Sequence, residues 1–356
     1  MMTTPPNFAD CCRRAIGRLM KRVYLTGDDV ETLFNAMLSE NDRPLSDEES
    51  ALLSGLLVAI AIQGETVGEL AGAARVMRRH AKRIQVIGSP VVDIVGTGGD
   101  ALDTFNISTT SAFVAAGAGL VIAKYGNRAA SGRCGSADVL EYCGINLNIT
   151  PERVEELIAE LGIGFLFAQQ FHPALRRVAA LRKRLGFRTL FNLLGPLTNP
   201  AGASCVLIGV CTPQLTEMFA ETLRELGCRR AMVVHGYDGM DEMTVTTRSR
   251  VTELTDDRMR TYDFFPELYF DGELANPEEL HGGDAAANAA ILRGILDGTI
   301  RGAKRNIVLL NSGAAIFCAG KAKSVEEGIR LAAESINSGA ANDKFNRLIA
   351  LSQQTS

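Results

Sequence analysis

The sequence predicts an α/β protein with a small all-helical N-terminal domain and a larger domain built around a mainly parallel sheet. From about residue 87 onward, apolar runs typical of buried strands alternate with helical patterns, whereas residues 8–83 show helical spacing alone. The chain has 356 residues, enough for about two domains of typical size. The predicted domains are a helical unit (1–86, joined by a helix at about 171–187) and a large α/β domain (87–170 and 188–356).

The helical unit is predicted to contain four helices with short links. They cover residues 12–23, 30–38, 46–62 and 66–79. Capping-box sequences begin the last two, at Ser46 and Thr66, each followed by a glutamate three residues later. The third helix has an apolar stripe made of Leu52, Leu53, Leu56, Leu57 and Ile60. Such a stripe must be buried, against its own unit or against a second copy of the chain.

The larger domain is predicted from alternating strands and helices. The predicted strands are 91–95, 120–123, 205–210, 231–234 and 306–310, and the helices between and after them are 151–161, 213–226, 284–296 and 325–337. Right-handed crossovers would place the turn after Val95 at the carboxyl edge of the sheet, where ligands usually bind in such folds.

Composition and charge exclude several functional classes. The net charge is −4 without a long basic run, which disfavours a nucleic-acid partner. No apolar run is long enough to cross a membrane. The eight cysteines form no CxxC pair and have no histidine nearby in sequence, which disfavours a zinc site and a cysteine nucleophile. Because no secretory segment is recognisable, we expect reduced thiols and a cytoplasmic protein.

A glycine-rich turn follows the first predicted strand. It contains Gly96, Thr97, Gly98, Gly99 and Asp100. Without Cβ atoms, the backbone N–H groups of such a turn can form a concave anion site before a helix N-terminus. Hydroxyl and amide residues follow it, namely Thr104, Asn106, Ser108 and Thr109. These residues favour phosphate binding over the alternative, a tight turn in a βα unit.

A second polar loop follows the next predicted strand. Its polar residues include Lys124, Asn127, Arg128 and Ser136, and several glycines are interspersed among them. A cationic loop of this kind suits a phosphorylated ligand. Taken alone, the pattern also fits a long surface loop.

Two adjacent carboxylates, Asp241 and Glu242, lie in a further loop after a predicted strand. Mg²⁺ is commonly bound by one or two carboxylates together with phosphate oxygens and water. The alternative is an acidic turn, and the phosphate-type loops elsewhere in the chain favour the metal site.

The segment from His172 to Leu185 reads as a helix with one apolar and one basic face that could form a wall over the site. The alternative is a solvated basic face. Residues 192–200 contain two prolines and a glycine, so they form either a rigid pocket wall or a simple corner.

Several of these stretches together resemble one family. They read GTGGD, DTFNIST, KYGNRAASG, GSADVLE, NLLGPLTNP, HGYDGMDE and GGDAAANAAILRGIL. They are similar to the successive signatures of the anthranilate phosphoribosyltransferases, in the family's order, and the helical unit resembles that family's small domain. The resemblance covers nearly the whole chain and implies the nucleoside phosphorylase/phosphoribosyltransferase class III type of fold.

The resemblance implies transfer of the phosphoribosyl group of 5-phosphoribosyl-1-pyrophosphate to anthranilate, giving N-(5-phosphoribosyl)anthranilate and pyrophosphate, in tryptophan biosynthesis. It implies donor binding by Gly96, Thr97, Gly99, Asp100, Thr104, Asn106, Lys124 and Ser136. It implies two Mg²⁺ ions, one at Ser108 and one at Asp241 and Glu242. It implies an anthranilate channel lined by Asn127, His172, Arg182 and Pro196, with Arg182 facing the carboxylate, and a homodimer formed through the helical unit. An aromatic amine is already a neutral nucleophile, so no covalent nucleophile or general base is expected.

One position departs from the family, which usually has histidine where this chain has Tyr125. Tyrosine is rarely charged near neutrality, but it can stack on an aromatic ring and hydrogen-bond a carboxylate. It could also narrow the acceptor channel. The competing hypotheses are therefore a paralogue that uses another acceptor or binds nucleic acid, and a pyrimidine nucleoside phosphorylase. The acidic charge and the retained GTGGD stretch, Ser108 and carboxylate pair count against loss of catalysis, and the GTGGD and NLLGPLTNP stretches resemble the transferase and not the phosphorylase.

Overall fold

The structure of the protein is a computed structural model. It describes residues 7–39, 43–88, 90–100, 102–129 and 133–354.

The N-terminal region forms the four predicted helices. They are α1 (Phe8–Leu19), α2 (Gly27–Ser39), α3 (Asp47–Gln63) and α4 (Val67–His80). Both predicted capping boxes are present, because Ser46 and Thr66 each accept a hydrogen bond from the N–H of the glutamate three residues later. The α3 stripe is buried as predicted at Leu53, Leu56, Leu57 and Ile60, while Leu52 is half-buried.

The rest of the chain is organised around one seven-stranded sheet. Its strands are β1 (Val91–Gly96), β2 (Val121–Gly126), β3 (Ile163–Phe167), β4 (Cys205–Gly209), β5 (Arg230–Gly236), β6 (Ser249–Thr255) and β7 (Arg258–Phe264). The spatial order is β3-β2-β1-β4-β5-β6-β7. The first five are parallel to one another, and β6 is antiparallel to both of its neighbours, β5 and β7. The prediction of a mainly parallel sheet is therefore confirmed.

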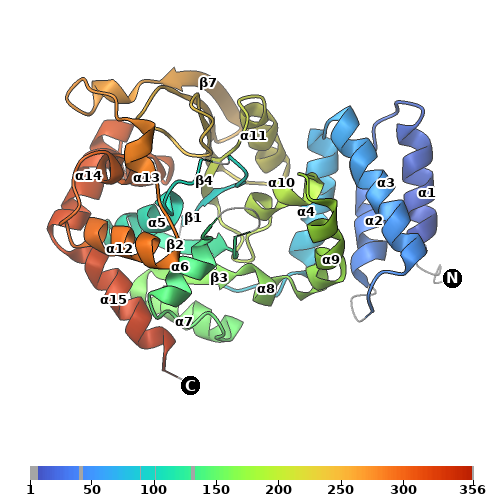
Figure 1. Cartoon of the computed structure of the whole chain (residues 1–356), viewed down its shortest axis with the longest axis horizontal. Helices are drawn as coiled ribbons and strands as arrows, with labels where there is room; N and C mark the ends of the chain where they lie inside the picture. The colour runs from blue at the N-terminus through green and yellow to red at the C-terminus, as the bar shows by residue number, and fades with distance from the viewer. Residues whose placement is uncertain (1–6, 40–42, 89, 101, 130–132, 355–356) are drawn as a thin grey trace.

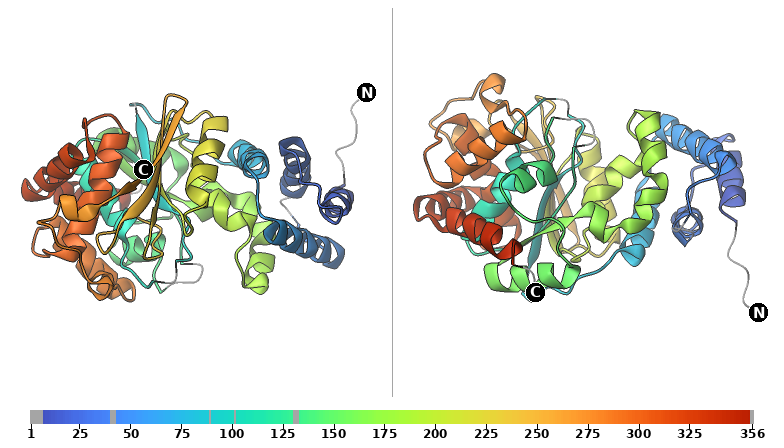
Figure 2. Two further views of the ribbon diagram at one scale, coloured as in Figure 1. Left: turned by 90° about the horizontal axis from the view of Figure 1, so that it is seen from above. Right: turned by 60° about the horizontal axis from the view of Figure 1, so that its bottom comes forward.

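Helices cover both faces of the sheet (Figure 2). Those after β1 are α5 (Ile107–Gly117), α6 (Ser136–Tyr142), α7 (Pro151–Leu161), α8 (Ala168–Phe171), α9 (Arg176–Leu185), α10 (Leu190–Leu194), α11 (Leu215–Glu225), α12 (Ala285–Leu296), α13 (Ala303–Cys318), α14 (Val325–Asn337) and α15 (Ala340–Ser352). Four short 3₁₀ helices, η1 (Pro173–Leu175), η2 (Gly195–Leu197), η3 (Pro266–Leu268) and η4 (Pro277–Leu280), complete the helices of the described residues. In Figure 1, α1–α4 lie at one end of the molecule beside α9 and α10, and α12–α15 lie at the other end.

Strand periodicity divides the core between the two faces. On β1, Val92 and Ile94 pack into the core beneath α5 and α13, whereas Val95 packs into the core shared with α4 and α10. Successive side chains of a strand point to opposite faces, so this division follows from the sequence alternation. The helical unit therefore shares a core with one face of the sheet.

A buried ion pair also joins the helical unit to α9. The guanidinium of Arg177 donates to a carboxylate oxygen of Glu49 at 3.0 Å and to the carbonyl of Met37 at 2.5 Å. Because Arg177 and Glu49 are both buried, this pair ties α9 to α2 and α3.

Two predicted elements are wrong. Residues 306–310, predicted as a strand, lie inside the helix α13. That helix is buried on almost every side, and an apolar run without amphipathic spacing does not separate a buried helix from a buried strand. The predicted helix from His172 to Leu185 is interrupted, since His172 follows α8 and η1 precedes α9. The ring of a proline clashes sterically with the preceding residue when that residue is helical, and His172 directly precedes Pro173. The helix is therefore broken at His172.

Within the described part of the chain, no helix combines the length and apolarity that spanning a membrane requires.

Candidate functional site

The glycine-rich turn and the carboxylate pair meet at the carboxyl edge of the sheet. The backbone N–H of Gly98 donates to a carboxylate oxygen of Asp241 at 2.7 Å. The N–H of Thr97 donates to the carbonyl of Gly209 at the end of β4. Gly98 and Gly99 have φ angles of +68° and +83°, which glycine adopts without strain. The sequence therefore predicted correctly that both stretches belong to strand-end loops, and the structure brings them into contact.

Two glycines make room for Asp241. A Cβ on Gly96 would overlap the Asp241 carboxylate, and a Cβ on Gly209 would overlap its backbone carbonyl. These two glycines are paired in register on the neighbouring strands β1 and β4. The space beside Asp241 thus depends on missing side chains from both strands.

Glu242 lies close to Ser108 at the start of α5. Burial raises the pKa of Asp241 well above its usual range, and the charges of Asp100 and Glu242 add to this rise. Burial likewise raises the pKa of Glu242, against the opposing charge of Lys124. Crowded carboxylates of this kind repel one another, and a cation between them would remove that repulsion.

The donor set fits Mg²⁺, which prefers oxygen ligands. Asp241 and Glu242 supply carboxylate oxygens, and Ser108 supplies a hydroxyl. Among the described residues, no three His, Cys, Asp or Glu side chains converge closely enough to hold a metal by themselves. Ligand oxygens and water would therefore have to complete the coordination, as is usual for Mg²⁺ bound together with a phosphate.

Polar side chains before α5 connect this site to the C-terminal helices. Thr104 forms an isolated β-bridge with His281. Asn106, at the N-terminus of α5, donates to the carbonyl of Cys134 and accepts from the side chain of Asn288 on α12, each at 3.0 Å. This contact with Asn106 explains why the alanine-rich helix α12 contains an asparagine, Asn288. The sequence alone did not explain it.

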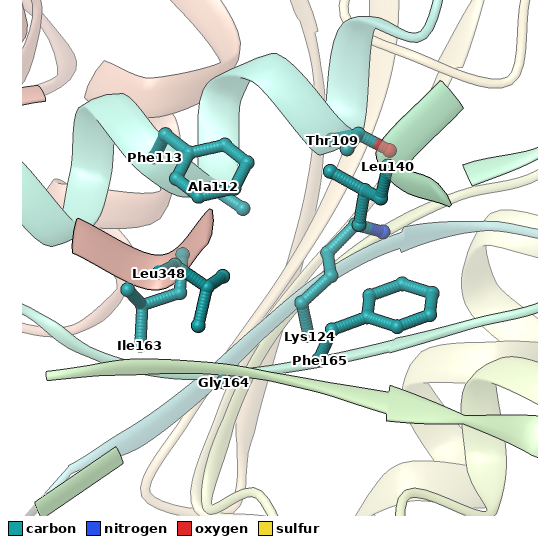
Figure 3. A pocket seen from close by; sticks show the side chains of 9 residues that line it. All are labelled: Thr109, Ala112, Phe113, Lys124, Leu140, Ile163, Gly164, Phe165 and Leu348. Atoms are coloured by element: carbon teal, nitrogen blue, oxygen red, sulfur yellow. The ribbon is translucent and has the colours of Figure 1, made fainter. Parts of the chain in front are cut away.

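Lys124, on β2, has its side chain buried beneath α5. Its Nζ donates to the carbonyl of Ile94 at 2.6 Å. Burial lowers the pKa of Lys124, and the charges of Asp93, Glu242 and Asp241 oppose this change. Figure 3 shows the side chain beside a small cavity under α5, whose lining also includes Thr109 and Phe165. Lys124 therefore provides positive charge close to the carboxylates from inside the protein.

The loop after β2 is held by its own hydrogen bonds. The hydroxyl of Ser136 donates to the backbone carbonyl of Asn127 at 3.2 Å, and the Asn127 side chain is exposed. Arg128 pairs with Asp138 and Glu141 on α6. Residues 130–132 of this loop lie outside the described residues. The structure thus places Ser136 and Asn127 together at the start of α6.

Tyr125 and His172 form a second cluster, on the opposite face of the sheet. The phenol oxygen lies 2.9 Å from His172 Nδ1, and both side chains are buried. The charge of Arg182 acts on Tyr125, and its guanidinium lies over the ring of Phe191 at 5.3 Å. Pro196 is buried in η2. Tyr125 therefore contacts His172, 47 positions away in the sequence, and is affected by the charge of Arg182.

Sequence reasoning missed Arg188, which precedes α10. Its guanidinium lies 3.7 Å from where a Cβ of Gly99 would be, and it contacts the sulfur of Cys211. A cation beside the glycine turn is suited to an anionic ligand. The sequence feature that could have identified Arg188 is its position just before the motif at 192–200.

It also missed Asn199, whose side chain donates to the buried carboxylate of Asp93 at 2.7 Å and to the carbonyl of Ala123 at 2.8 Å. The motif at 192–200 therefore fastens β1 to β2.

Comparisons with known proteins agree with this geometry. Residues 88–342 match the family described as "Glycosyl transferase family, a/b domain", and residues 13–81 match "Glycosyl transferase family, helical bundle domain". The chain is 50% identical over 336 residues to the anthranilate phosphoribosyltransferase of Desulfosudis oleivorans, covering 94% of this chain and 97% of the relative.

Two solved structures of the same enzyme are similar over nearly the whole chain. That of Thermus thermophilus has 42% identity and a TM-score of 0.88, covering 96% of this chain and 99% of the other. That of Saccharomyces cerevisiae, in complex with PRPP and Mg, has 25% identity and a TM-score of 0.88, covering 96% and 98%.

Proposed function

The chain belongs to the anthranilate phosphoribosyltransferases, and we propose how its own residues perform the reaction of that family. The enzyme transfers the phosphoribosyl group of PRPP to the amine of anthranilate and releases pyrophosphate, in tryptophan biosynthesis. The identity over nearly full length supports this activity and not the alternative of a paralogue with another acceptor or a nucleic-acid ligand.

The observation that supports the proposed site best is the contact between the glycine turn and Asp241. We propose that the turn and the α5 N-terminus bind the donor. The donor residues would be Gly96, Thr97, Gly99, Asp100, Thr104, Asn106 and Ser136, with Lys124 and Arg188 adding positive charge. Within the described residues, the backbone N–H of Gly99 makes no hydrogen bond, so it can donate to a phosphate oxygen.

Charge develops at two places as the reaction proceeds. Positive charge builds on the ribose ring, and negative charge builds on the departing pyrophosphate. Oriented N–H donors and the positive end of α5 stabilise the negative charge where it appears. Lys124 lies behind the carboxylates and limits their repulsion of the donor phosphates. No side-chain base is needed, because the amine attacks in its neutral form.

Two Mg²⁺ ions are proposed for this site, one bound at Ser108 and the other at Asp241 and Glu242. The yeast relative's complex with PRPP and Mg supports a magnesium site, and the crowded carboxylates described above provide the ligands. When bound, Mg²⁺ supplies positive charge that stabilises the leaving pyrophosphate.

The acceptor site is proposed on the other face of the sheet. It would be lined by Tyr125, His172, Arg182 and Pro196, and Asn127 would reach it from the exposed loop after β2. In this proposal Arg182 faces the anthranilate carboxylate, since its guanidinium has no carboxylate partner among the described residues. A guanidinium suits a carboxylate because it can donate two parallel hydrogen bonds.

The assay that tests the function is direct. Purified protein, PRPP, Mg²⁺ and anthranilate are mixed, and the loss of anthranilate fluorescence is followed. We expect turnover that requires all three additions and stops when EDTA removes the metal. Turnover that continues at full rate in EDTA would contradict the magnesium proposal.

A homodimer through the helical unit is also proposed. Large apolar side chains are exposed in the α1–α2 link and on α3, and they are Met20, Val23, Tyr24, Val58 and Ile62. Met20 and Ile62 are 80% and 82% exposed, and a second copy would bury them.

Light scattering after size exclusion tests the dimer. We expect Ile62→Lys to shift the protein from dimer to monomer, because a charge at the centre of an apolar contact must be desolvated. Leu268→Lys, also at an exposed apolar residue but on η3, should leave the dimer intact. A monomeric wild-type protein would contradict the proposal.

The remaining proposals concern domains and location. We propose the division into a helical domain over 1–86, joined by 171–187, and a catalytic domain over 87–170 and 188–356. The contact of α9 with α2 and α3 supports the joining segment. We propose a cytoplasmic location, which the eight free cysteines support.

A further inference from the structure

Tyr125 and His172 form an isolated polar contact inside an apolar environment. The phenol and Nδ1 are 2.9 Å apart, and the two rings meet edge to face at 68° with centroids 5.5 Å apart. Tyr125 is 5% exposed and His172 is 3% exposed. The other imidazole nitrogen, Nε2, is buried and has no hydrogen-bond partner within the part of the chain that the structure describes. A buried polar atom without a partner costs free energy, so its retention calls for an explanation.

The protonation states restrict how this contact is made. Burial lowers the pKa of His172 to about 4, so its imidazole is neutral near pH 7 and has one N–H and one bare nitrogen. Burial raises the pKa of Tyr125 well above its usual value, so the phenol keeps its proton. Among the described residues, the phenol oxygen is hydrogen-bonded only to His172 Nδ1, and the hydroxyl of Thr198 donates to the carbonyl of Gly195 at 3.1 Å. The phenol proton is then directed to His172 Nδ1, and the imidazole proton lies on Nε2.

A second donor without an anionic partner lies nearby. The guanidinium of Arg182 is stacked over Phe191 and makes no ion pair with a carboxylate of the described residues. Phe191 packs in the core that contains Val95, and Tyr125 packs with Val91 on the same face of β1, so Arg182 lies on the same side of the sheet as the phenol. An N–H of a neutral imidazole and a guanidinium, both lacking an acceptor, together suit a carboxylate.

We propose that Tyr125 is a positioning residue for the acceptor, because its hydroxyl holds His172 in the tautomer that presents Nε2–H to the acceptor's carboxylate. This inference rests on the proposed acceptor site. Tyr125 acts through His172 and does not itself need to touch the substrate. A phenol remains a donor across the physiological pH range, whereas a second imidazole at this position would change its charge near neutrality. Tyrosine therefore fixes the tautomer of its neighbour independently of pH.

The tautomer can be measured directly in the protein without substrate. The chain has four histidines, so ¹⁵N-histidine labelling and long-range ¹H–¹⁵N spectra give a small number of signals. The His172 signals are assigned by their loss in His172→Gln. We expect the Nε2–H tautomer in the wild-type protein at pH 7, and a mixture of tautomers or the Nδ1–H form in Tyr125→Phe. A wild-type His172 in the Nδ1–H form, or an unchanged tautomer in Tyr125→Phe, would overturn the inference.

Steady-state kinetics provide the second readout. Tyr125→Phe keeps the ring and removes only the hydroxyl, and we expect the KM for anthranilate to rise about threefold to tenfold, as loss of one hydrogen bond would produce. The KM for PRPP should not change, whereas a general loss of structure would affect both substrates. The matched control is Tyr262→Phe, which removes a partly buried phenol from β7 at the far edge of the sheet. It should leave both KM values unchanged.

His172→Gln distinguishes failure of the proposed acceptor site from failure of the positioning role of Tyr125. If this variant leaves the KM for anthranilate unchanged, the proposed acceptor site is wrong. If it raises that KM while Tyr125→Phe does not, the acceptor site stands and the positioning role of Tyr125 is wrong.

Discussion

Lys124 and Tyr125 are neighbours in the chain, yet they belong to opposite faces of the sheet and to opposite kinds of environment. Lys124 lies under α5, where its ammonium group is hydrogen-bonded to Ile94 and counters nearby carboxylates. Tyr125 lies on the other face, where its hydroxyl contacts His172. The alternation of a single strand thus supplies both proposed substrate sites from consecutive positions.

The two faces also differ in what they lack. On the Lys124 face, the excess is negative, because Asp100, Asp241 and Glu242 crowd one another. On the Tyr125 face, the buried carboxylate of Asp93 already accepts hydrogen bonds from the backbone of Tyr125 and from Asn199, whereas His172 Nε2 and Arg182 have no anionic partner among the described residues. One face is thus prepared for cations and the other for an anion. The following predictions test this difference, in order of decreasing effect.

The double variant Asp241→Asn, Glu242→Gln should have the largest effect. We expect turnover to fall about 10³-fold, since the charges that would bind Mg²⁺ are removed from the leaving-group side. The melting temperature should stay the same or rise, because burial and mutual repulsion raise both pKa values in the folded protein, so the charged forms are destabilising at neutral pH. Calorimetry and the fluorescence assay check both. Glu156→Gln, an exposed carboxylate on α7, is the control. A turnover within threefold of wild type would contradict the assignment.

Gly96→Ala should reduce turnover about 10²-fold. The new Cβ would overlap the Asp241 carboxylate and displace it from the N–H of Gly98. The matched control is Gly17→Ala on α1, where a Cβ meets nothing within 4 Å, and it should raise helix stability by about 1 kcal/mol. The apparent Mg²⁺ affinity in the assay is the measurement. An unchanged affinity would show that the proposed metal site does not depend on this carboxylate position.

Arg182→Ala should raise the KM for anthranilate about tenfold or more and leave the KM for PRPP nearly unchanged. Loss of a charged hydrogen-bond donor from a largely buried site accounts for this size. Arg184→Ala, on the same helix but exposed, should change neither value. Equal effects on both substrates would remove Arg182 from the acceptor side and weaken the contrast between the faces.

The smallest effect concerns stability alone. A hydrogen bond from Arg43, together with Ser46 and Arg177, lowers the pKa of Glu49 to about 2 against the opposing effect of burial. A depressed folded-state pKa gives stability that is present above the unfolded pKa of about 4.5 and is lost as the pH falls toward 2. We expect the melting temperature to drop by a few degrees over that window, and Glu49→Gln to remove this part of the pH dependence. If Glu49→Gln left the pH profile of the melting temperature unchanged, the ionisation of Glu49 would not be its cause.

Local signals in the sequence predicted the parts of the fold that depend on neighbouring residues. The capping boxes at Ser46 and Thr66 were recognisable because their partners are three residues away. The glycine turn was recognisable because its chemistry lies within five consecutive residues. The arrangement of Asp241 over Gly98 was not, because the two residues are separated by 143 positions and only the sheet brings them together.

The strands β6 and β7 escaped prediction for a different reason. Their burial alternates weakly, and polar and charged residues occupy much of both strands near the sheet edge. The local sign of this hairpin is the aspartate pair Asp256 and Asp257, whose φ angles of +44° and +68° are typical of a two-residue hairpin connection. The acceptor-side contact of Tyr125 with His172 had no such signal, because it depends on a break in a helix and on a strand 47 residues away.

The pairing of Gly96 with Gly209 has a consequence for anyone who diversifies this enzyme. Both strands must stay bare at one rung of the ladder, and a Cβ on either would collide with the same residue, Asp241. A library that samples one of these positions while holding the other fixed gains no room, because neither glycine can compensate for a larger neighbour. Randomisation aimed at new substrates should therefore spare this rung and concentrate on the Tyr125 face.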